Sequence, residues 1–168
     1  MTQETQDAPS MNPSTNLKTS LPPVREIVPH GGAMLLLDAL VHADDTHCVA
    51  RAEIRGTQLF VDASGMPAWV GIEYMAQTIA AWSGMRDRLA GKPPGVGFLL
   101  GSRRYECDVS HFPIGSTLTV HAQPELIGDN GLGQFSCRID MAGREVARAN
   151  VSVFQPADAQ AFLQGQEV

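Results

Sequence analysis

The chain has 168 residues, of which 43% are hydrophobic and 18% are charged, and its formal net charge is -6. This length allows one domain with a substantial core, and the acidic balance argues against nucleic acid or an anionic membrane as the main partner. The sequence has no run of 18 apolar residues and no basic start followed by an apolar stretch. It therefore predicts no membrane span and no secretory signal, and a cytoplasmic protein.

Residues 1–20 are rich in Thr, Gln, Ser, Asn and Pro, a composition typical of a disordered N-terminal tail. The folded domain is expected over residues 21–157. Within it, the apolar run 34–37 opens a first strand or a short helix. Residues 47–55 alternate between apolar and polar side chains, which predicts a half-buried strand.

A long helix is predicted from Pro67 to about Leu89. Pro67 suits the first helical turn, and the Gly- and Pro-rich segment 91–95 ends the helix. Its side chains are apolar almost all the way round, which indicates burial on most sides. Glu73 lies in the first two turns, and a lone carboxylate on such a helix needs a partner or a chemical task.

Four strands are predicted after the helix, at 96–107, 116–126, 133–141 and 145–154, with Gly-containing turns between them. Their spacing predicts an antiparallel meander. The fold class is therefore α+β, with an antiparallel sheet wrapped around one long central helix. Residues 158–168 are expected to form a C-terminal tail.

Several segments together resemble the ApeP-like dehydratases, the aryl-polyene type of hotdog-fold 3-hydroxyacyl-acyl-carrier-protein dehydratase. The segments that carry this resemblance are Pro29-His30, the run Gly71 to Met85 with Glu73-Tyr74-Met75-Ala76-Gln77, and Gly97 to Arg103. The resemblance covers about residues 22–156. It implies a hotdog fold and the dehydration of a 3-hydroxyacyl thioester to a trans-2-enoyl thioester.

The resemblance also implies a His and the helix Glu, here Glu73, facing each other across a dimer interface as base and acid. Backbone amides at the start of the helix, those of Ala68 and Trp69, would stabilise the thioester oxygen. Gln77, one turn after Glu73, is expected to bind at the site, where it either orients Glu73 or packs.

The chain departs from the wider dehydratase family at the position of the usual catalytic His, which is Leu59 here. Leu59 can neither take nor give a proton. His30, at a family Pro-His position, is the stronger substitute, with a structural His as the alternative. His111 begins a His-Phe-Pro sequence but follows the helix, which disfavours it.

Other candidates are weaker. Asp62 is either a second carboxylate at the mouth of the site or a solvated loop residue, and Arg103 and Arg104 either dock an acidic acyl carrier protein or are solvated. Cys48, Cys107 and Cys137 show no metal-ligand spacing and are expected to be core thiols. Without a Gly-rich phosphate loop or a His/Cys cluster, neither a metal nor another cofactor is predicted.

The expected partners are an acyl carrier protein bearing the thioester and a second hotdog subunit, in a homodimer or a heterodimer. Three other functions stay open. The chain could be a catalytically incomplete subunit of a heterodimeric dehydratase, a hotdog thioesterase in which Glu73 activates water, or a non-enzymatic acyl-binding module.

Overall fold

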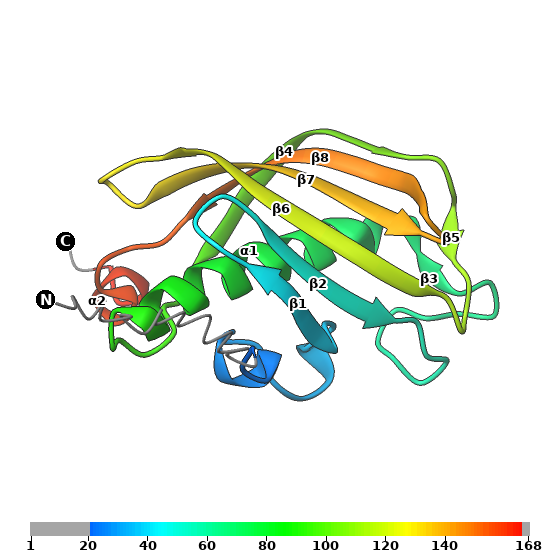
Figure 1. Cartoon of the computed structure of the whole chain (residues 1–168), viewed down its shortest axis with the longest axis horizontal. Coiled ribbons are helices and arrows are strands. Elements are labelled where there is room, and N and C mark those ends of the chain that lie inside the picture. The colour runs from blue at the N-terminus through cyan, green and yellow to red at the C-terminus, as the bar shows by residue number, and fades with distance from the viewer. Residues whose placement is uncertain (1–20, 166–168) are drawn as a thin grey trace, which may run out of the picture.

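The computed structural model describes residues 21–165, so the predicted tail at 1–20 lies outside the described residues. Its main feature is a six-stranded antiparallel sheet that curves over one long helix, α1 (Gly71–Leu89) (Figure 1). In spatial order the strands are β1 (Ala39–Ala43), β2 (Cys48–Glu53), β6 (Thr117–Ile127), β7 (Leu132–Met141), β8 (Arg144–Phe154) and β4 (Phe98–Cys107). This arrangement confirms the predicted α+β hotdog fold.

The helix has the limits that its flanking residues predict. A single 3-10 turn, Ala68–Val70, follows Pro67 and leads directly into α1. After Leu89 the chain turns at Gly91, whose φ of +70° is a left-handed conformation that favours glycine and ends helices. The predicted helix over residues 67–89 is therefore confirmed.

The core lies between α1 and the concave face of the sheet. Strand β7 shows why these residues form this layer, because its side chains alternate between exposed and buried positions from Leu132 to Ile139. The helix contributes large buried side chains to the same core, among them Tyr74, Met75, Ile79 and Trp82. Trp69 is an exception to the expected burial, since 61% of it is exposed at the start of the helix.

The predicted four-strand meander is wrong in one respect. β6, β7 and β8 follow one another as hairpins, but β4 pairs with β8 at the edge of the sheet and not with β6. After β4 the chain forms β5 (His111–Phe112), which pairs with β3 (Met66–Pro67), before β6 joins β2. This detour carries the chain across the sheet.

The apolar run 34–37 was expected to open a first strand or a short helix. A 3-10 turn, Gly32–Met34, overlaps its start, and the first strand, β1, begins just after the run, at Ala39. In addition, the predicted C-terminal tail contains a short helix, α2 (Ala159–Leu163). Phe162 of α2 packs against Phe98 and Phe154, with ring centroids 5.2 and 5.3 Å apart.

The segment 21–37 covers α1 on the side away from the sheet (Figure 1). It approaches the helix very closely at Gly84, where a Cβ atom would overlap the carbonyl oxygen of Ile27. Trp82 secures the neighbouring β1–β2 turn, because its Nε1–H donates to the carbonyl of Asp44 at 2.9 Å. Among the helices of residues 21–165, none is long and apolar enough to cross a membrane.

Candidate active site

The covering segment brings His30 next to Glu73. His30 Nε2 lies 3.6 Å from Glu73 Oε1, and the two side chains are 27% and 29% exposed. Both therefore reach solvent while standing partly in the protein. The resemblance implied a pair across a dimer interface, whereas this His and this Glu come from one chain.

A buried amide holds Glu73 in place. Gln77, fully buried one turn further along α1, donates from Nε2 to Glu73 Oε1 at 2.8 Å and to the carbonyl of Met34 at 2.7 Å. Its Oε1 accepts from the backbone N–H of Leu36 at 2.9 Å. Gln77 thus orients the carboxylate and fastens the segment that carries His30, and these bonds satisfy its amide.

His30 has one nitrogen that the protein leaves free. Its Nδ1 is buried and has no hydrogen-bond partner within residues 21–165. Buried polar atoms are nearly always bonded, so this nitrogen needs an explanation, and a catalytic role of the ring is one. The other ring nitrogen, Nε2, faces the carboxylate of Glu73.

His30 and Glu73 stand at one end of a cavity of about 250 Å³. Its walls are mainly apolar and mix small with large side chains. From α1 come Ala76, Ile79, Ala80, Trp82 and Ser83; from the sheet and its loops come Gly95, Gly97, Phe98, Leu99, Ile127, Gly128, Gly131, Leu132, Gly133, Phe135, Val153 and Gln155. A titratable pair beside an apolar channel is suited to acid–base chemistry on a molecule with a hydrocarbon part.

Sequence reasoning did not find most of this lining. One signal was available in the sequence, since Ala76, Ala80 and Ser83 follow Glu73 at spacings that place small side chains on one face of the helix. The other lining residues come from strands and loops that are distant from one another in sequence. Nothing local predicts that they meet.

The remaining predicted residues lie elsewhere. Ala68 and Trp69 do not line the cavity, and the N–H of Ala68 already donates to the carbonyl of Ser110 at 2.9 Å. His111 Nε2 stands 3.5 Å from Asp62 Oδ2, and neither residue lines the cavity that holds Glu73. The backbone amide of Ala68 and the His111–Asp62 pair are thus separate from the His30–Glu73 cavity within this chain.

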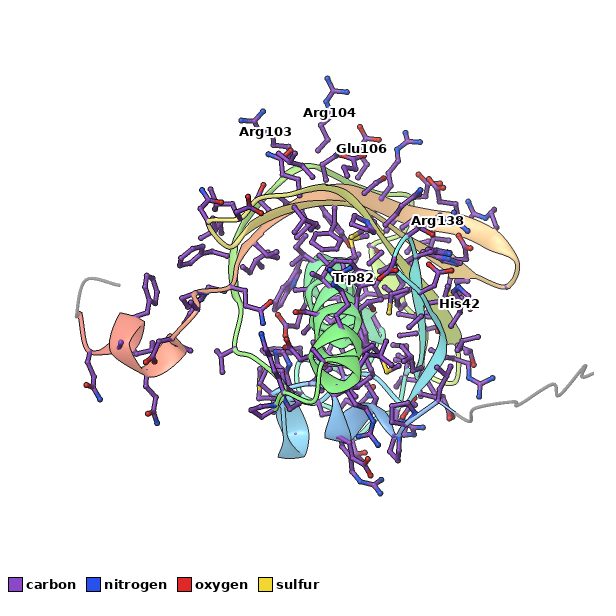
Figure 2. All side chains as sticks on the ribbon, turned by 60° about the vertical axis from the view of Figure 1, so that its left-hand side comes forward. His42, Trp82, Arg103, Arg104, Glu106 and Arg138 are labelled. Carbon is purple, nitrogen blue, oxygen red and sulfur yellow. The ribbon has the colours of Figure 1, made fainter. Side chains whose placement is uncertain are left out.

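Arg103 and Arg104 are exposed on β4 and point away from α1, on the outer side of the sheet (Figure 2). They line a shallow depression there with Gln134, Asn150, Val151 and Ser152. The start of the same strand, Phe98 and Leu99, lines the cavity. One strand therefore connects the two arginines with the candidate site.

Two of the three cysteines are core residues, and Cys107 is half-buried against the core. Cys48 and Cys137 are buried, and burial raises the pKa of each thiol to about 12. Such thiols stay protonated and unreactive near neutral pH. Among residues 21–165, no group of three or more His, Cys, Asp or Glu side chains has an arrangement that could hold a metal ion.

Comparison with known proteins places these features in a family. The profile of the ApeP-like family, described as ApeP dehydratase, matches residues 22–164. The chain is 28% identical to a chain of the dehydratase heterocomplex ApeI:P from Xenorhabdus doucetiae, with a TM-score of 0.79, and the match covers 86% of this chain and 97% of that one. No curated protein matches the sequence.

More distant structures share the fold alone. A hypothetical thioesterase from Streptococcus pneumoniae TIGR4, solved with coenzyme A, is 13% identical at a TM-score of 0.52, over 70% of this chain and 84% of that one. The PaaI protein from the phenylacetic acid degradation operon of E. coli is 14% identical at 0.53, over 70% and 78%.

Proposed function

We propose, since this chain belongs to the ApeP-like dehydratase family, that it dehydrates 3-hydroxyacyl thioesters of an acyl carrier protein to trans-2-enoyl thioesters. The pathway would be aryl polyene or fatty-acid-like biosynthesis. The observation that carries the proposal is the His30–Glu73 pair at the end of an apolar cavity. The cavity walls suit an acyl chain, and the pair suits the reacting carbons.

The chemistry requires two proton transfers. One side chain of the pair removes the proton from C2, and the electron pair of that bond forms the C2–C3 double bond. The other donates a proton to the 3-hydroxyl as the C3–O bond breaks, so that water leaves. Glu73 and His30 supply a donor and an acceptor within reach of one substrate, and Gln77 keeps the carboxylate in position.

A second hotdog subunit is part of the proposal. The sheet ends at β4, whose outer edge pairs with no strand of the described residues. Leu59, Phe60 and Trp69, in the segment before α1, are also exposed and apolar, and the rings of Phe60 and Trp69 meet edge to face at 5.4 Å. Surfaces of this kind are suited to a partner.

The partner-subunit function is the second candidate. Two observations favour it: Leu59 replaces the usual His, and the similar Xenorhabdus doucetiae chain was solved in a dehydratase heterocomplex. In that case this chain would contribute Glu73, or only packing, to a heterodimer whose other subunit brings the catalytic His, and His30 would be dispensable for turnover. A homodimer with two complete sites is the alternative assembly.

Carrier docking at Arg103 and Arg104 also belongs to the proposal. The two guanidinium groups stand exposed side by side in a chain of net charge -6. Their strand continues to the cavity, so a carrier bound there would lie on the element that leads to the site. Opposite charge on the carrier would then speed its association.

The test is a product assay. The purified chain, alone and mixed with a second hotdog subunit, is given a 3-hydroxyacyl carrier-protein thioester, and the carrier is analysed by mass spectrometry. A loss of one water that depends on Glu73 supports the dehydratase. Release of free acid would instead show a thioesterase, and dehydration by the mixture that survives Glu73→Gln would show a supporting subunit.

A further inference from the structure

We infer that a hydrogen-bonded pair, Ser83 and Gln155, closes the far end of the cavity and sets the longest acyl chain that the protein accepts. The inference rests on the proposed function in one respect, that the cavity holds an acyl chain. To the proposed function it adds the residues that determine chain-length specificity and a substrate class, which is acyl chains of limited length.

The distance from the reacting end to the pair follows from the helix. Glu73 and Ser83 both line the cavity on one face of α1, ten residues apart in sequence. At a rise of 1.5 Å per residue they stand about 15 Å apart along the helix axis. An extended chain advances about 1.25 Å per carbon, because C–C bonds of about 1.5 Å zigzag, so about twelve carbons fit between them.

Hydrogen bonds hold Ser83 and Gln155 in place as a wall at this end of the cavity. Ser83 Oγ donates to Gln155 Oε1 at 2.6 Å, and Gln155 Nε2 lies 3.4 Å from Asp87 Oδ2. The backbone N–H of Gln155 donates to the carbonyl of Gly131 at 2.9 Å, which fixes the residue just after β8. A hydrocarbon end that passed this point would break hydrogen bonds between partly buried groups, which costs free energy without a replacement partner.

A second hollow lies behind the wall. It is lined by Phe154, Phe162 of α2, and the Gly128–Gly131 turn, and Gln155 lines both this hollow and the cavity. Gly128 and Gly131 also line both hollows, and of these three shared residues Gln155 is the one with a long side chain. Gly95 permits its position, because a Cβ at Gly95 would overlap Gln155 Nε2.

The test is a chain-length profile. The full chain, with its second subunit where turnover needs it, is given small-molecule 3-hydroxyacyl thioesters of increasing length, and kcat/KM is reported relative to a short-chain substrate. For the native protein this ratio should fall beyond about fourteen carbons, the twelve that fit plus the reacting end. Gln155→Ala should move the fall to longer chains and raise the ratio there about tenfold.

Two further variants make the profile specific. Ala80→Leu narrows the cavity before the wall and should move the fall to shorter chains. Gln123→Ala makes the same substitution as Gln155→Ala at an exposed position of β6 and should leave the profile as it is. An unchanged limit in Gln155→Ala, in a protein whose melting temperature is native, would overturn the inference.

A binding series separates this inference from the proposed function. Acyl-pantetheine thioesters of the same lengths are titrated calorimetrically into the native protein and into Gln155→Ala. If Gln155→Ala binds longer chains than the native protein but no substrate is dehydrated, the role of Gln155 stands and the dehydratase is rejected. If substrates are dehydrated and the length limit is the same in Gln155→Ala, the dehydratase stands and the role of Gln155 is rejected. An absence of binding at every length would reject the two proposals together.

Discussion

One carboxylate oxygen, Oε1 of Glu73, lies 3.6 Å from Nε2 of His30 and also accepts a hydrogen bond from Gln77. The other oxygen of Glu73 is not used in these contacts. The arrangement leaves a carboxylate whose orientation is fixed by the protein and whose second oxygen can meet a substrate hydroxyl.

The pair leads to the central prediction. Glu73→Gln keeps the shape of the side chain and removes its titration, so dehydration should fall by about 10²–10⁴ with the melting temperature nearly unchanged. His30→Ala should cause a loss of similar size. Steady-state kinetics with a small-molecule 3-hydroxyacyl thioester measures both.

Asp62→Asn is the matched control, since it neutralises a carboxylate that does not line the cavity. If Glu73→Gln is inactive while His30→Ala retains native turnover, the imidazole comes from a second subunit. Native turnover in both variants would assign the pair a structural role.

A second prediction concerns Gln77. Gln77→Ala leaves the N–H of Leu36 and the carbonyl of Met34 without their partner in a buried position and opens a cavity beside them. The free energy of unfolding should fall by about 2–4 kcal/mol in urea titrations. Gln123→Ala, at an exposed position, should change it by less than about 0.5 kcal/mol. Equal stability of the two variants would refute the anchoring role.

Gly84 permits a prediction whose sign opposes helix propensity. Ala in a helix interior is usually about 1 kcal/mol more stable than Gly. At Gly84, however, the added Cβ would overlap the Ile27 carbonyl, so Gly84→Ala should destabilise by about 1–3 kcal/mol. Gly31→Ala, where a Cβ meets nothing within 4 Å, should be close to neutral. Thermal unfolding of both variants decides the matter.

The stacked imidazoles of His47 and His121 predict a pH dependence of stability. Burial, and to a smaller extent the nearby charge of Arg138, holds the pKa of His121 below its usual value, although Asp140 opposes this shift. Burial, and to a smaller extent the charge of His42, lowers the pKa of His47, whose ring stacks on that of His121. At pH values between these lowered pKa values and the unfolded pKa, the unfolded chain therefore binds more protons than the folded chain. Stability is fully present above the unfolded pKa of about 6.5 and declines as pH falls through it towards the folded values.

Differential scanning calorimetry between about pH 8 and about pH 5 should show this decline as a falling melting temperature. His121→Gln should flatten the slope, because it removes one of the two imidazoles that resist protonation in the folded state. A slope that is the same in the native chain and in His121→Gln would show that other groups dominate the pH dependence.

Carrier docking gives the last prediction. Replacing Arg103 and Arg104 with Glu should raise KM for carrier-bound substrate and reduce the sensitivity of turnover to salt, since screened attraction is lost. Turnover of a small-molecule thioester should be spared, because both side chains point away from the cavity side of the sheet. Equal losses on both substrates would indicate misfolding.

The helix and its carboxylate were predictable because their signals are local. The limits of α1 follow from Pro67 and Gly91, and the position of Glu73 on it follows from helical periodicity. The pairing of β4 with β8 was not predictable, because strand order depends on contacts between distant segments and local spacing favours a meander. β1 is short and irregularly buried, with a register shift between Leu40 and His42, so it lacks a clear alternating pattern.

The candidate site shows the same division. Glu73 and His30 were candidates from the sequence alone, but the cavity beside them combines one helix face with strands and loops from distant parts of the chain. Trp69 shows the limit of composition, because a large apolar side chain in a buried helix was expected to be buried and is exposed at its start.

The close approach of Gly84 to Ile27 has a consequence for the substitutions that the chain can tolerate. Together with the bonds of Gln77, it fastens the segment carrying His30 to the helix carrying Glu73 at two points within one polypeptide. The distance between His30 and Glu73 is thus set by packing inside a single chain. Substitutions on the outer surfaces of the chain can therefore accumulate without disturbing that spacing.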